Sequence, residues 1–248
     1  MRQGIMGAWN GLLDVVYPPI CLLCRSRLEC GALCSECVRG FAPVAPPFCA
    51  RCGAPIPIAS PLCSPCLAGL TPAYDWSQAL GEYTGPLRTA IHRLKYDGKT
   101  MLAEPLGRLL ARSLDDPPSR LLHPQLKGPA VEFDLVTPVP LHPARLRERG
   151  FNQSERIAFH LARERGWPLD TGRLIRQRRT GTQTALDVSA RAANVQGAFA
   201  VRGTLAYAGS SVLLVDDVLT TSATVKEAAR VVREAGAIRV GVVALARD

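Results

Sequence analysis

The segment Val212–Val225 reads VLLVDDVLTTSATV, and its pattern decides the fold that we expect for the whole chain. An apolar, β-branched run comes directly before two adjacent aspartates, Asp216 and Asp217, and five small residues follow at 220–224. Such a run is typical of a strand buried on both faces of a parallel sheet. Beyond it, Thr224–Ala235 places apolar side chains on one helical face and charges on the other. The segment therefore predicts a buried strand, an acidic loop and a helix.

The loop between this strand and this helix carries the groups that a sugar phosphate needs. The first N–H groups of a helix lack internal partners and carry the positive end of its dipole, so they attract phosphate. Carboxylates accept hydrogen bonds from vicinal hydroxyls. We expect a sugar diol on Asp216 and Asp217, and a phosphate on Thr220, Thr221, Ser222, Ala223 and Thr224. Two alternatives stay open: these residues only cap a helix, or the acid pair binds Mg²⁺.

The cysteines are confined to one segment. All nine lie between Cys21 and Cys66, and eight of them form four C-x-x-C pairs. Four thiolates make a closed tetrahedral Zn²⁺ site, and this spacing lets two of them point at one ion. Cys30 is left over, and we interpret it as a non-ligand. Taken in order, the pairs predict two structural zinc sites, formed by Cys21, Cys24, Cys34 and Cys37 and by Cys49, Cys52, Cys63 and Cys66.

Two alternatives to this zinc assignment remain, namely a disulfide framework and an interleaved pairing of the four C-x-x-C units. The segment is short and rich in proline, so zinc would supply most of its folding free energy. A closed zinc site has no open coordination position, which favours a scaffold over a catalytic role. We expect residues 1–70 to form an N-terminal helix with a double zinc ribbon, and residues 71–248 to form a second domain.

The composition limits the classes of partner. The 248 residues include 30 Lys and Arg against 21 Asp and Glu, a net charge of +9 that favours anionic partners such as nucleotides, pyrophosphate or nucleic acid. No run approaches the roughly 18 consecutive apolar residues of a membrane helix. The first 20 residues, mildly apolar, predict a short amphipathic helix packed on the protein. We therefore expect a cytoplasmic chain without membrane insertion.

The rest of the chain alternates strand and helix patterns. A helix is predicted with Thr84 as its N-cap and Gly98 past its end, and a second over 100–114, kinked or tightened around Pro105. A strand is predicted over Phe133–Pro140, and a further helix from about Ser154. The segment LHPARLRERGFNQ between the last two is expected to be a loop. Alternating strands and helices indicate a parallel α/β sheet, whose ligands bind beyond the carboxyl ends of the strands.

The quoted segment resembles the 5-phosphoribosyl 1-pyrophosphate (PRPP) signature of type I phosphoribosyltransferases. In that family two acids bind the ribose hydroxyls and the following loop takes the 5′-phosphate. Ser222 departs from the pattern, because glycine is usual there, and a left-handed backbone would strain a serine. The resemblance implies an α/β fold of the type I phosphoribosyltransferase kind, a parallel sheet flanked by helices, with Mg²⁺ arriving together with PRPP.

The whole chain resembles the ComF family, which also includes GntX-like proteins. The cysteine pairs, HRLKYDGK, TPVPLHPARLRERGFNQ, RRTGTQTALDVSARAANVQGAF and VLLVDDVLTTSATV follow one another in the order seen in that family. This resemblance implies a role in natural competence and in the use of imported single-stranded DNA, with competence proteins as further partners. It implies phosphoribosyltransferase chemistry without identifying an acceptor base.

The phosphoribosyltransferase resemblance also assigns residues outside the signature. Arg145 and Arg149 would hold pyrophosphate, because guanidinium groups bind phosphoryl oxygens in pairs. Segment 178–195 resembles the loop that closes over PRPP, with Arg179, Gln183 and Arg191 as its substrate contacts. Lys95 could reach the same anion, but we interpret it, like Arg147, as a surface residue, and the four histidines as packing or surface residues.

Three functions compete at this stage: a competence-linked PRPP-binding protein, a nucleotide-salvage phosphoribosyltransferase, and a non-catalytic DNA-binding scaffold with a vestigial transferase domain. The complete acid pair argues against the third. The lack of an identifiable base-reading segment weakens the second.

Overall fold

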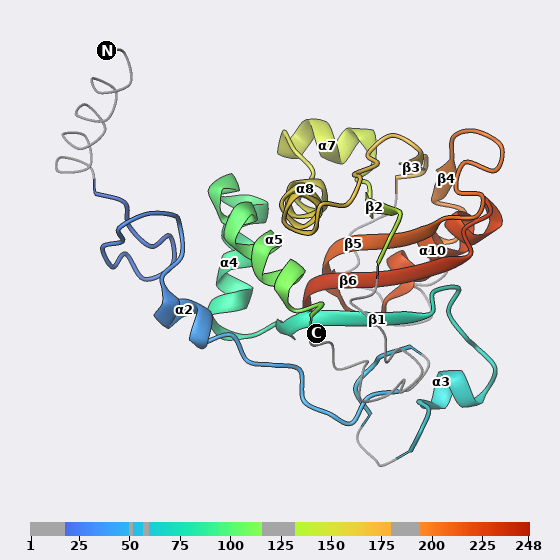
Figure 1. The fold of residues 1–248 in the computed structure, drawn as a ribbon, viewed down its shortest axis with the longest axis horizontal. Helices are drawn as coiled ribbons and strands as arrows, with labels where there is room; N and C mark the ends of the chain where they lie inside the picture. Colours follow the sequence, from blue (N-terminus) through green and yellow to red (C-terminus); the bar gives the residue numbers. More distant parts are fainter. Residues whose placement is uncertain (1–17, 50–51, 57–59, 116–131, 180–193) are drawn as a thin grey trace.

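A four-stranded parallel sheet forms the centre of the molecule (Figure 1). The computed structural model describes residues 18–49, 52–56, 60–115, 132–179 and 194–248. In the order β1-β6-β5-β2, the strands are Trp76–Glu82, Arg239–Arg247, Ser211–Leu219 and Leu135–Pro138. All three pairings are parallel. Because β6 and β5 lie between partners and are apolar on both faces, they are buried along almost their whole length.

Helices cover both faces of this sheet. One face carries α4 (Gly85–Tyr96), the 3-10 turn η1 (Thr100–Leu102), α5 (Ala103–Arg112) and α8 (Gln153–Arg165). The other face carries α10 (Ala223–Glu234) and the antiparallel pair β3 (Leu174–Arg176) and β4 (Phe199–Val201). Successive residues of β5 serve different cores: Leu213 packs with the α4–α5–α8 layer, and Leu214 packs with α10. Successive side chains of a strand point to opposite faces, so a strand between two helical layers contributes alternate residues to each core.

The cysteine-rich segment packs on both sides of the sheet. The first half, with helix α2 (Ser35–Arg39), contributes Ala32 to the core shared with α4 and α5. The second half, with helix α3 (Ser64–Leu67), contributes Cys49, Cys52 and Cys66 to the core shared with α10. The boundary placed at residue 70 stays a prediction. The shared cores indicate that both halves depend on the sheet for part of their packing.

The predicted helices agree with the structure to within a few residues. Helix α4 follows Thr84 as its N-cap and ends before Gly98, whose φ is +63°. Helix α8 begins after Asn152, whose side chain accepts a hydrogen bond from the Ser154 N–H at 3.1 Å. The predicted second helix is split, because a 3-10 turn precedes α5. The predicted N-terminal helix lies almost entirely outside the described residues.

Two expectations about local structure were wrong. The segment after β2 is not a simple loop: it contains helix α7 (Pro143–Arg149), which starts at a proline and ends at Gly150 with φ +81°. His142 caps this helix by accepting a hydrogen bond from the Ala144 N–H at 3.2 Å. The acid pair is not in a loop either, because β5 continues through both aspartates to Leu219 and stays paired with β6.

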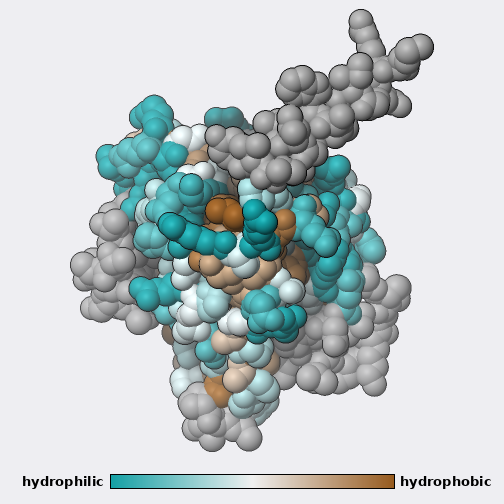
Figure 2. Space-filling model, turned by 90° about the vertical axis from the view of Figure 1, so that its left-hand side faces the viewer, coloured by the Kyte–Doolittle hydropathy of each residue, from teal (hydrophilic) through white to brown (hydrophobic). Residues whose placement is uncertain are grey.

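The side of the molecule nearest the first half of the cysteine-rich segment is shown in Figure 2. Apolar side chains gather in a small central area there, and hydrophilic side chains surround them. No helix in the described part of the chain is both long and apolar enough to cross a membrane.

Candidate functional site

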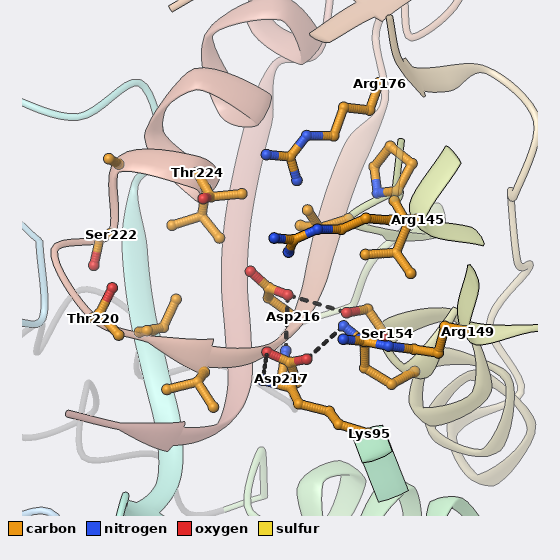
Figure 3. A pocket seen from close by; sticks show the side chains of 18 of the residues that line it. Lys95, Arg145, Arg149, Ser154, Arg176, Asp216, Asp217, Thr220, Ser222 and Thr224 are labelled. Atoms are coloured by element: carbon orange, nitrogen blue, oxygen red, sulfur yellow. Dashed lines mark hydrogen bonds and ion pairs between the residues drawn. The ribbon is translucent and has the colours of Figure 1, made fainter. Parts of the chain in front are cut away.

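A polar pocket of about 230 Å³ lies at the carboxyl ends of β5 and β2 (Figure 3). This is the edge at which parallel α/β sheets bind ligands. Both aspartates of β5 line it, together with Thr220, Ser222 and Thr224 from the turn into α10. Two helices, α4 and α7, and strand β3 of the second sheet supply the cations around them, which are Lys95, Arg145, Arg149 and Arg176.

The N-terminus of α8 holds the two carboxylates in place. The Ser154 hydroxyl donates to Asp216 Oδ1 at 3.0 Å, and Gln153 Nε2 donates to Asp217 Oδ2 at 2.6 Å. The Asp217 N–H also donates to Asp216 Oδ1, at 2.9 Å. Gln153 in turn accepts a hydrogen bond from Arg149, whose guanidinium lies 5.4 Å from the ring centroid of Tyr96. The acid pair is therefore oriented by side chains that precede it by more than 60 residues.

Burial and mutual repulsion disfavour two ionised carboxylates here. Asp216 and Asp217 are 9% and 6% exposed. Burial, reinforced by the charge of Asp217, raises the pKa of Asp216 to about 7, although Lys95 and Ser154 favour its ionised form. A carboxyl group that titrates near neutrality at the end of a buried strand is costly for folding, and perturbed groups of this kind cluster at functional sites.

We expect Asp216→Asn to be more stable than the unmodified chain at pH 8. The folded-state pKa is raised, so the stability that the protonated form contributes is complete below about pH 4 and is lost as the pH rises through about 7. The gain in the free energy of unfolding at pH 8 should exceed about 1 kcal/mol and shrink as the pH approaches 4. Urea unfolding at both pH values measures it. The control is Asp134→Asn, next to the amino ends of β2 and β5 and so away from the pocket. Equal gains in the two variants, or a gain that grows at low pH, would contradict this reading.

Lys95 is not a surface residue, contrary to the expectation from sequence. Its ammonium group lies 2.9 Å from Asp217 Oδ1, and its side chain is only 14% exposed. Burial opposes its charged form, but Asp217 outweighs burial and the pKa of Lys95 is raised. Helix α4 ends against the sheet edge, so a lysine in its last turn points at the pocket instead of at solvent. Lys95 thus partly neutralises the charge of the two carboxylates.

Lys95→Met should therefore destabilise the protein. It leaves the Asp217 carboxylate buried without its ammonium partner, a change that typically costs about 3 kcal/mol. Guanidinium unfolding with an unchanged slope would measure this as a lower midpoint. Lys99→Met removes an exposed lysine four residues later and serves as the matched control. A midpoint equal to that of the control would show that the ion pair contributes nothing to stability.

The turn into α10 adopts a left-handed backbone conformation at Ser222, as considered from the sequence. Ser222 is the N-cap of α10, with φ +58° in the left-handed region, where serine is less favoured than glycine. Thr220, Ser222, Ala223 and Thr224 all line the pocket. Thr221 does not: its hydroxyl is buried and has no hydrogen-bond partner in the described part of the chain. The turn therefore offers hydroxyls and the free N–H groups of a twelve-residue helix to the pocket.

The predicted arginines separate into two groups. Arg145 and Arg149, both on α7, line the pocket, whereas Arg147 on the same helix is exposed, as expected. Arg179 pairs with Glu148 at 3.0 Å between two exposed side chains and does not line the pocket. Gln183 and Arg191, the other two substrate contacts predicted for segment 178–195, lie outside the described residues.

Arg176 also lines the pocket, although it was not predicted from the sequence as a site residue. It ends β3, its guanidinium lies 5.2 Å from the ring centroid of Phe199, and burial lowers its pKa. Figure 3 shows the guanidinium groups of Arg145 and Arg176 directed toward the space between Asp216 and Thr224. Four cations thus face two carboxylates, so the pocket carries a positive excess suited to an anion.

The cysteines form two groups in sequence order. Cys21, Cys24, Cys34 and Cys37 form the first cluster, and Cys49, Cys52, Cys63 and Cys66 form the second cluster. Within each cluster the ligand atoms all lie within 4.8 Å of one another. The pairs do not interleave, and Cys30 is exposed and belongs to neither cluster.

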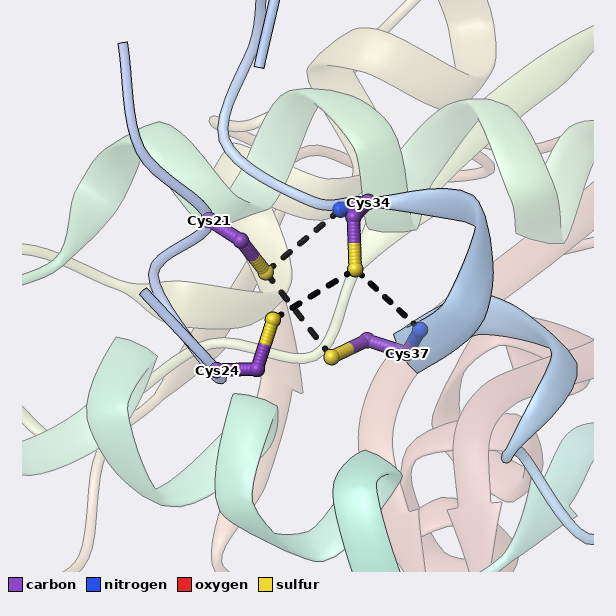
Figure 4. A group of neighbouring side chains, drawn as sticks. All are labelled: Cys21, Cys24, Cys34 and Cys37. Atoms are coloured by element: carbon purple, nitrogen blue, oxygen red, sulfur yellow. Dashed lines mark hydrogen bonds between the residues drawn. The ribbon is translucent and has the colours of Figure 1, made fainter. Parts of the chain in front are cut away.

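The sulfur geometry fits zinc. In the first cluster (Figure 4), Sγ atoms lie 3.8 Å apart for Cys21 and Cys37 and 3.6 Å apart for Cys24 and Cys34. Four thiolates about 2.3 Å from a tetrahedral zinc ion lie about 3.8 Å from one another, whereas bonded sulfurs are about 2 Å apart. The N–H groups of Cys34 and Cys37 donate to sulfur atoms of the cluster at 3.4 and 3.3 Å. The second cluster repeats this spacing, with 3.6 Å between Cys52 and Cys63.

Two family models match separate parts of the chain. Residues 12–72 match the family model of the double zinc ribbon domain, and residues 152–248 match that of the phosphoribosyl transferase domain. A DNA utilization protein YhgH of Escherichia coli O157:H7 is 33% identical over 237 residues, covering 94% of this chain and 99% of that protein. Competence protein F of Haemophilus influenzae is 31% identical, covering 92% of this chain and 96% of that protein.

The chain belongs to the ComF family. The expected fold class is thereby confirmed: a parallel sheet with flanking helices carries an N-terminal double zinc ribbon, and the two cysteine clusters are its structural zinc sites. Among solved structures, this ComF-family chain is similar to a glutamine PRPP amidotransferase from B. subtilis, at 26% identity and a TM-score of 0.36. The match covers 56% of the chain but only a quarter (25%) of that enzyme, so the fold assignment rests on the strand order and the family model.

Proposed function

We propose that this ComF-family chain binds PRPP together with Mg²⁺ in the pocket at the carboxyl ends of β5 and β2. The observation that carries the proposal is the pair of buried carboxylates beside a hydroxyl-rich helix N-terminus, surrounded by four cations. One end of this arrangement suits a diol and the two flanks suit phosphoryl groups. Few ligands other than a phosphorylated ribose carry these groups in that order.

Each part of PRPP has a counterpart among the lining residues. The ribose hydroxyls donate to Asp216 and Asp217, which retain acceptor capacity beyond their bonds to Ser154 and Gln153. The 5′-phosphate binds the first N–H groups of α10 and the hydroxyls of the turn. The pyrophosphate binds on the α7 side, where the two pocket-lining arginines lie. Mg²⁺, when bound, neutralises part of the pyrophosphate charge.

The chemistry open to such a complex is displacement at ribose C1. The bond from C1 to the pyrophosphate oxygen breaks, a nucleophile of the acceptor forms the new bond to C1, and the acceptor gives up a proton. The protein positions the two reactants and neutralises charge on the leaving group with Arg145 and Arg149. A nucleotide-salvage enzyme would use a purine or pyrimidine as this acceptor, and a non-catalytic family member would bind PRPP without turnover.

Thermal unfolding offers a first test of this proposal. A ligand that binds only the folded state at a hundredfold excess over its Kd stabilises by about 2.7 kcal/mol, which raises the melting temperature of a chain of this size by several degrees. PRPP with Mg²⁺ should give this increase, and ribose 5-phosphate or pyrophosphate alone should give less. Release of pyrophosphate in the presence of a panel of bases then separates an enzyme from a binding protein. No increase with any of the three ligands would refute the proposed function.

Single-stranded DNA is the second ligand that we propose, because curated relatives carry names that refer to DNA utilization and competence. Residues 142–191 contain eleven arginines and five acids, an excess of six positive charges. Binding through phosphates should weaken with salt, with a log–log slope of about −0.7 for each phosphate contacted. Titration of labelled single strands at several salt concentrations, with and without PRPP, measures this slope. A response that does not depend on salt, or no binding at low salt, would leave the basic excess to the PRPP pocket.

A further inference from the structure

A buried arginine links the second cluster to the turn that precedes α10. Arg247, at the end of β6, is 8% exposed, and its Nη2 donates to the Ser77 hydroxyl at 2.6 Å. The Ser77 hydroxyl donates in turn to the backbone carbonyl of Cys52, also at 2.6 Å. The path therefore runs from the C-terminal strand through β1 into the ligand set of the second cluster.

A buried guanidinium such as that of Arg247 is destabilising unless a negative charge lies nearby. Within the described residues it forms no ion pair with a carboxylate, and the groups that favour its charged form against burial are Tyr74 and Cys52. Burial raises the pKa of Tyr74 to about 12, so this phenol is neutral at physiological pH. Four thiolates around Zn²⁺ carry a net charge of −2. With zinc bound, the second cluster is therefore a source of negative charge near the buried guanidinium, to which the Ser77 hydroxyl connects it.

The same arginine lies directly beside the phosphate-binding turn. Arg247 is paired in register with Leu219, and the Asp248 N–H donates to the Leu219 carbonyl at 2.9 Å. Leu219 is the residue immediately before Thr220. Tyr74 packs in the same hydrophobic core as Leu219.

The second cluster packs closely against the sheet. Gly53 has φ +68°, and a Cβ at this position would lie 2.2 Å from the Ser77 carbonyl oxygen. Cys49, Cys52 and Cys66 share one hydrophobic core with Leu219 and Val225, which flank the turn. A shift of the second cluster therefore has to move either β1 or the turn.

We propose that Arg247 is a positioning residue that couples zinc binding at the second cluster to the order of the turn Thr220–Thr224. The Ser77 hydroxyl and the Cys52 carbonyl connect the guanidinium to the second cluster, and the backbone of Arg247 pairs with Leu219, the residue before the turn. The phosphate affinity of the turn then depends on zinc at the second cluster. This last consequence rests on the proposed function, whereas the coupling itself does not.

Three variants of the full-length, zinc-loaded protein test the coupling. Arg247→Met keeps the aliphatic stem but removes the charge, Arg247→Lys keeps a charge and a donor, and Arg239→Met removes an exposed arginine from the start of the same strand. Hydrogen exchange of peptides covering residues 219–225 reports the turn. Alkylation of individual cysteines by N-ethylmaleimide in the presence of a chelator, read by mass spectrometry, reports zinc loss from each cluster.

In Arg247→Met we expect cysteines of the second cluster to be alkylated about tenfold faster, within the 5- to 150-fold range of typical coupling. Those of the first cluster should react at the unmodified rate, and exchange in the turn should increase. Arg247→Lys should restore most of both effects, and Arg239→Met should show neither. Equal behaviour of Arg247→Met and Arg239→Met would overturn the proposal, as would a failure of lysine to rescue, since that indicates packing instead of charge. If the coupling is found in a protein that does not bind PRPP, the proposed function falls and the coupling stands.

Discussion

Replacing Asp216 and Asp217 together by asparagine will weaken the binding of PRPP in Mg²⁺ by about a hundredfold or more. Each carboxylate is expected to accept a charge-assisted hydrogen bond from a ribose hydroxyl, and such bonds contribute roughly 1.5–3 kcal/mol each. Losing two therefore costs at least about 3 kcal/mol, and 1.4 kcal/mol corresponds to a tenfold change in affinity. Asparagine keeps the volume and an acceptor for Ser154 and Gln153, so the pocket keeps its shape.

Calorimetric titration of both proteins at pH 8 measures this loss. Asp134 precedes β2 and accepts a hydrogen bond from the Ser211 N–H at the start of β5, so Asp134→Asn changes the net charge of the protein by one unit without touching the pocket and should bind normally. An unchanged Kd in the double variant would show that the ribose does not bind at the acid pair. A loss of affinity of equal size in the control would show that the change in net charge, and not the loss of ribose contacts, weakens binding.

Removal of both zinc ions should have the largest effect on stability. Structural zinc contributes roughly 10–16 kcal/mol to small zinc domains, which is comparable to the whole stability of a typical protein. Because the second cluster shares its core with α10 and the sheet, we expect chelation to lower the melting temperature of the whole chain by more than about 10 °C. The folding of residues 71–248 is therefore not expected to be independent of the metal.

Elemental analysis should find two zinc ions per chain before chelation and none after it. Cys30→Ser is the matched control, because Cys30 is exposed and outside both clusters, so this variant should keep both ions and melt normally. Disulfide-linked cysteines in the purified, non-reduced protein would contradict the zinc assignment. An unshifted melting transition of the metal-free protein would contradict the shared core.

The fold was predictable because local patterns and the tertiary structure agree. The apolar run at 212–215 is a central strand, the helix after it begins within a residue of its predicted start, and the four C-x-x-C pairs meet in sequence order. The extent of β5 was not predictable. An aspartate pair normally indicates a loop, but pairing with β6 on one side keeps both residues in the strand.

Local pattern failed where the site is assembled from distant segments. Lys95 carries no signal beyond its charge, and only the position of α4 against the sheet edge turns it toward Asp217. Gln153 and Ser154 follow an N-cap, so their sequence suggested only the start of a helix, whereas their side chains orient the acid pair. Arg176 lies in a segment of several arginines, and nothing local separates it from Arg179, which pairs at the surface instead.

The most direct test of the central claim is calorimetric titration of the unmodified, zinc-loaded protein with PRPP in Mg²⁺. One saturable site per chain is expected, with an affinity well above that for ribose 5-phosphate, because the pyrophosphate adds charge-assisted contacts to the α7 arginines. Omission of Mg²⁺ should weaken the binding. The absence of any saturable heat up to millimolar PRPP would contradict the account, since the pocket would then hold some other anion.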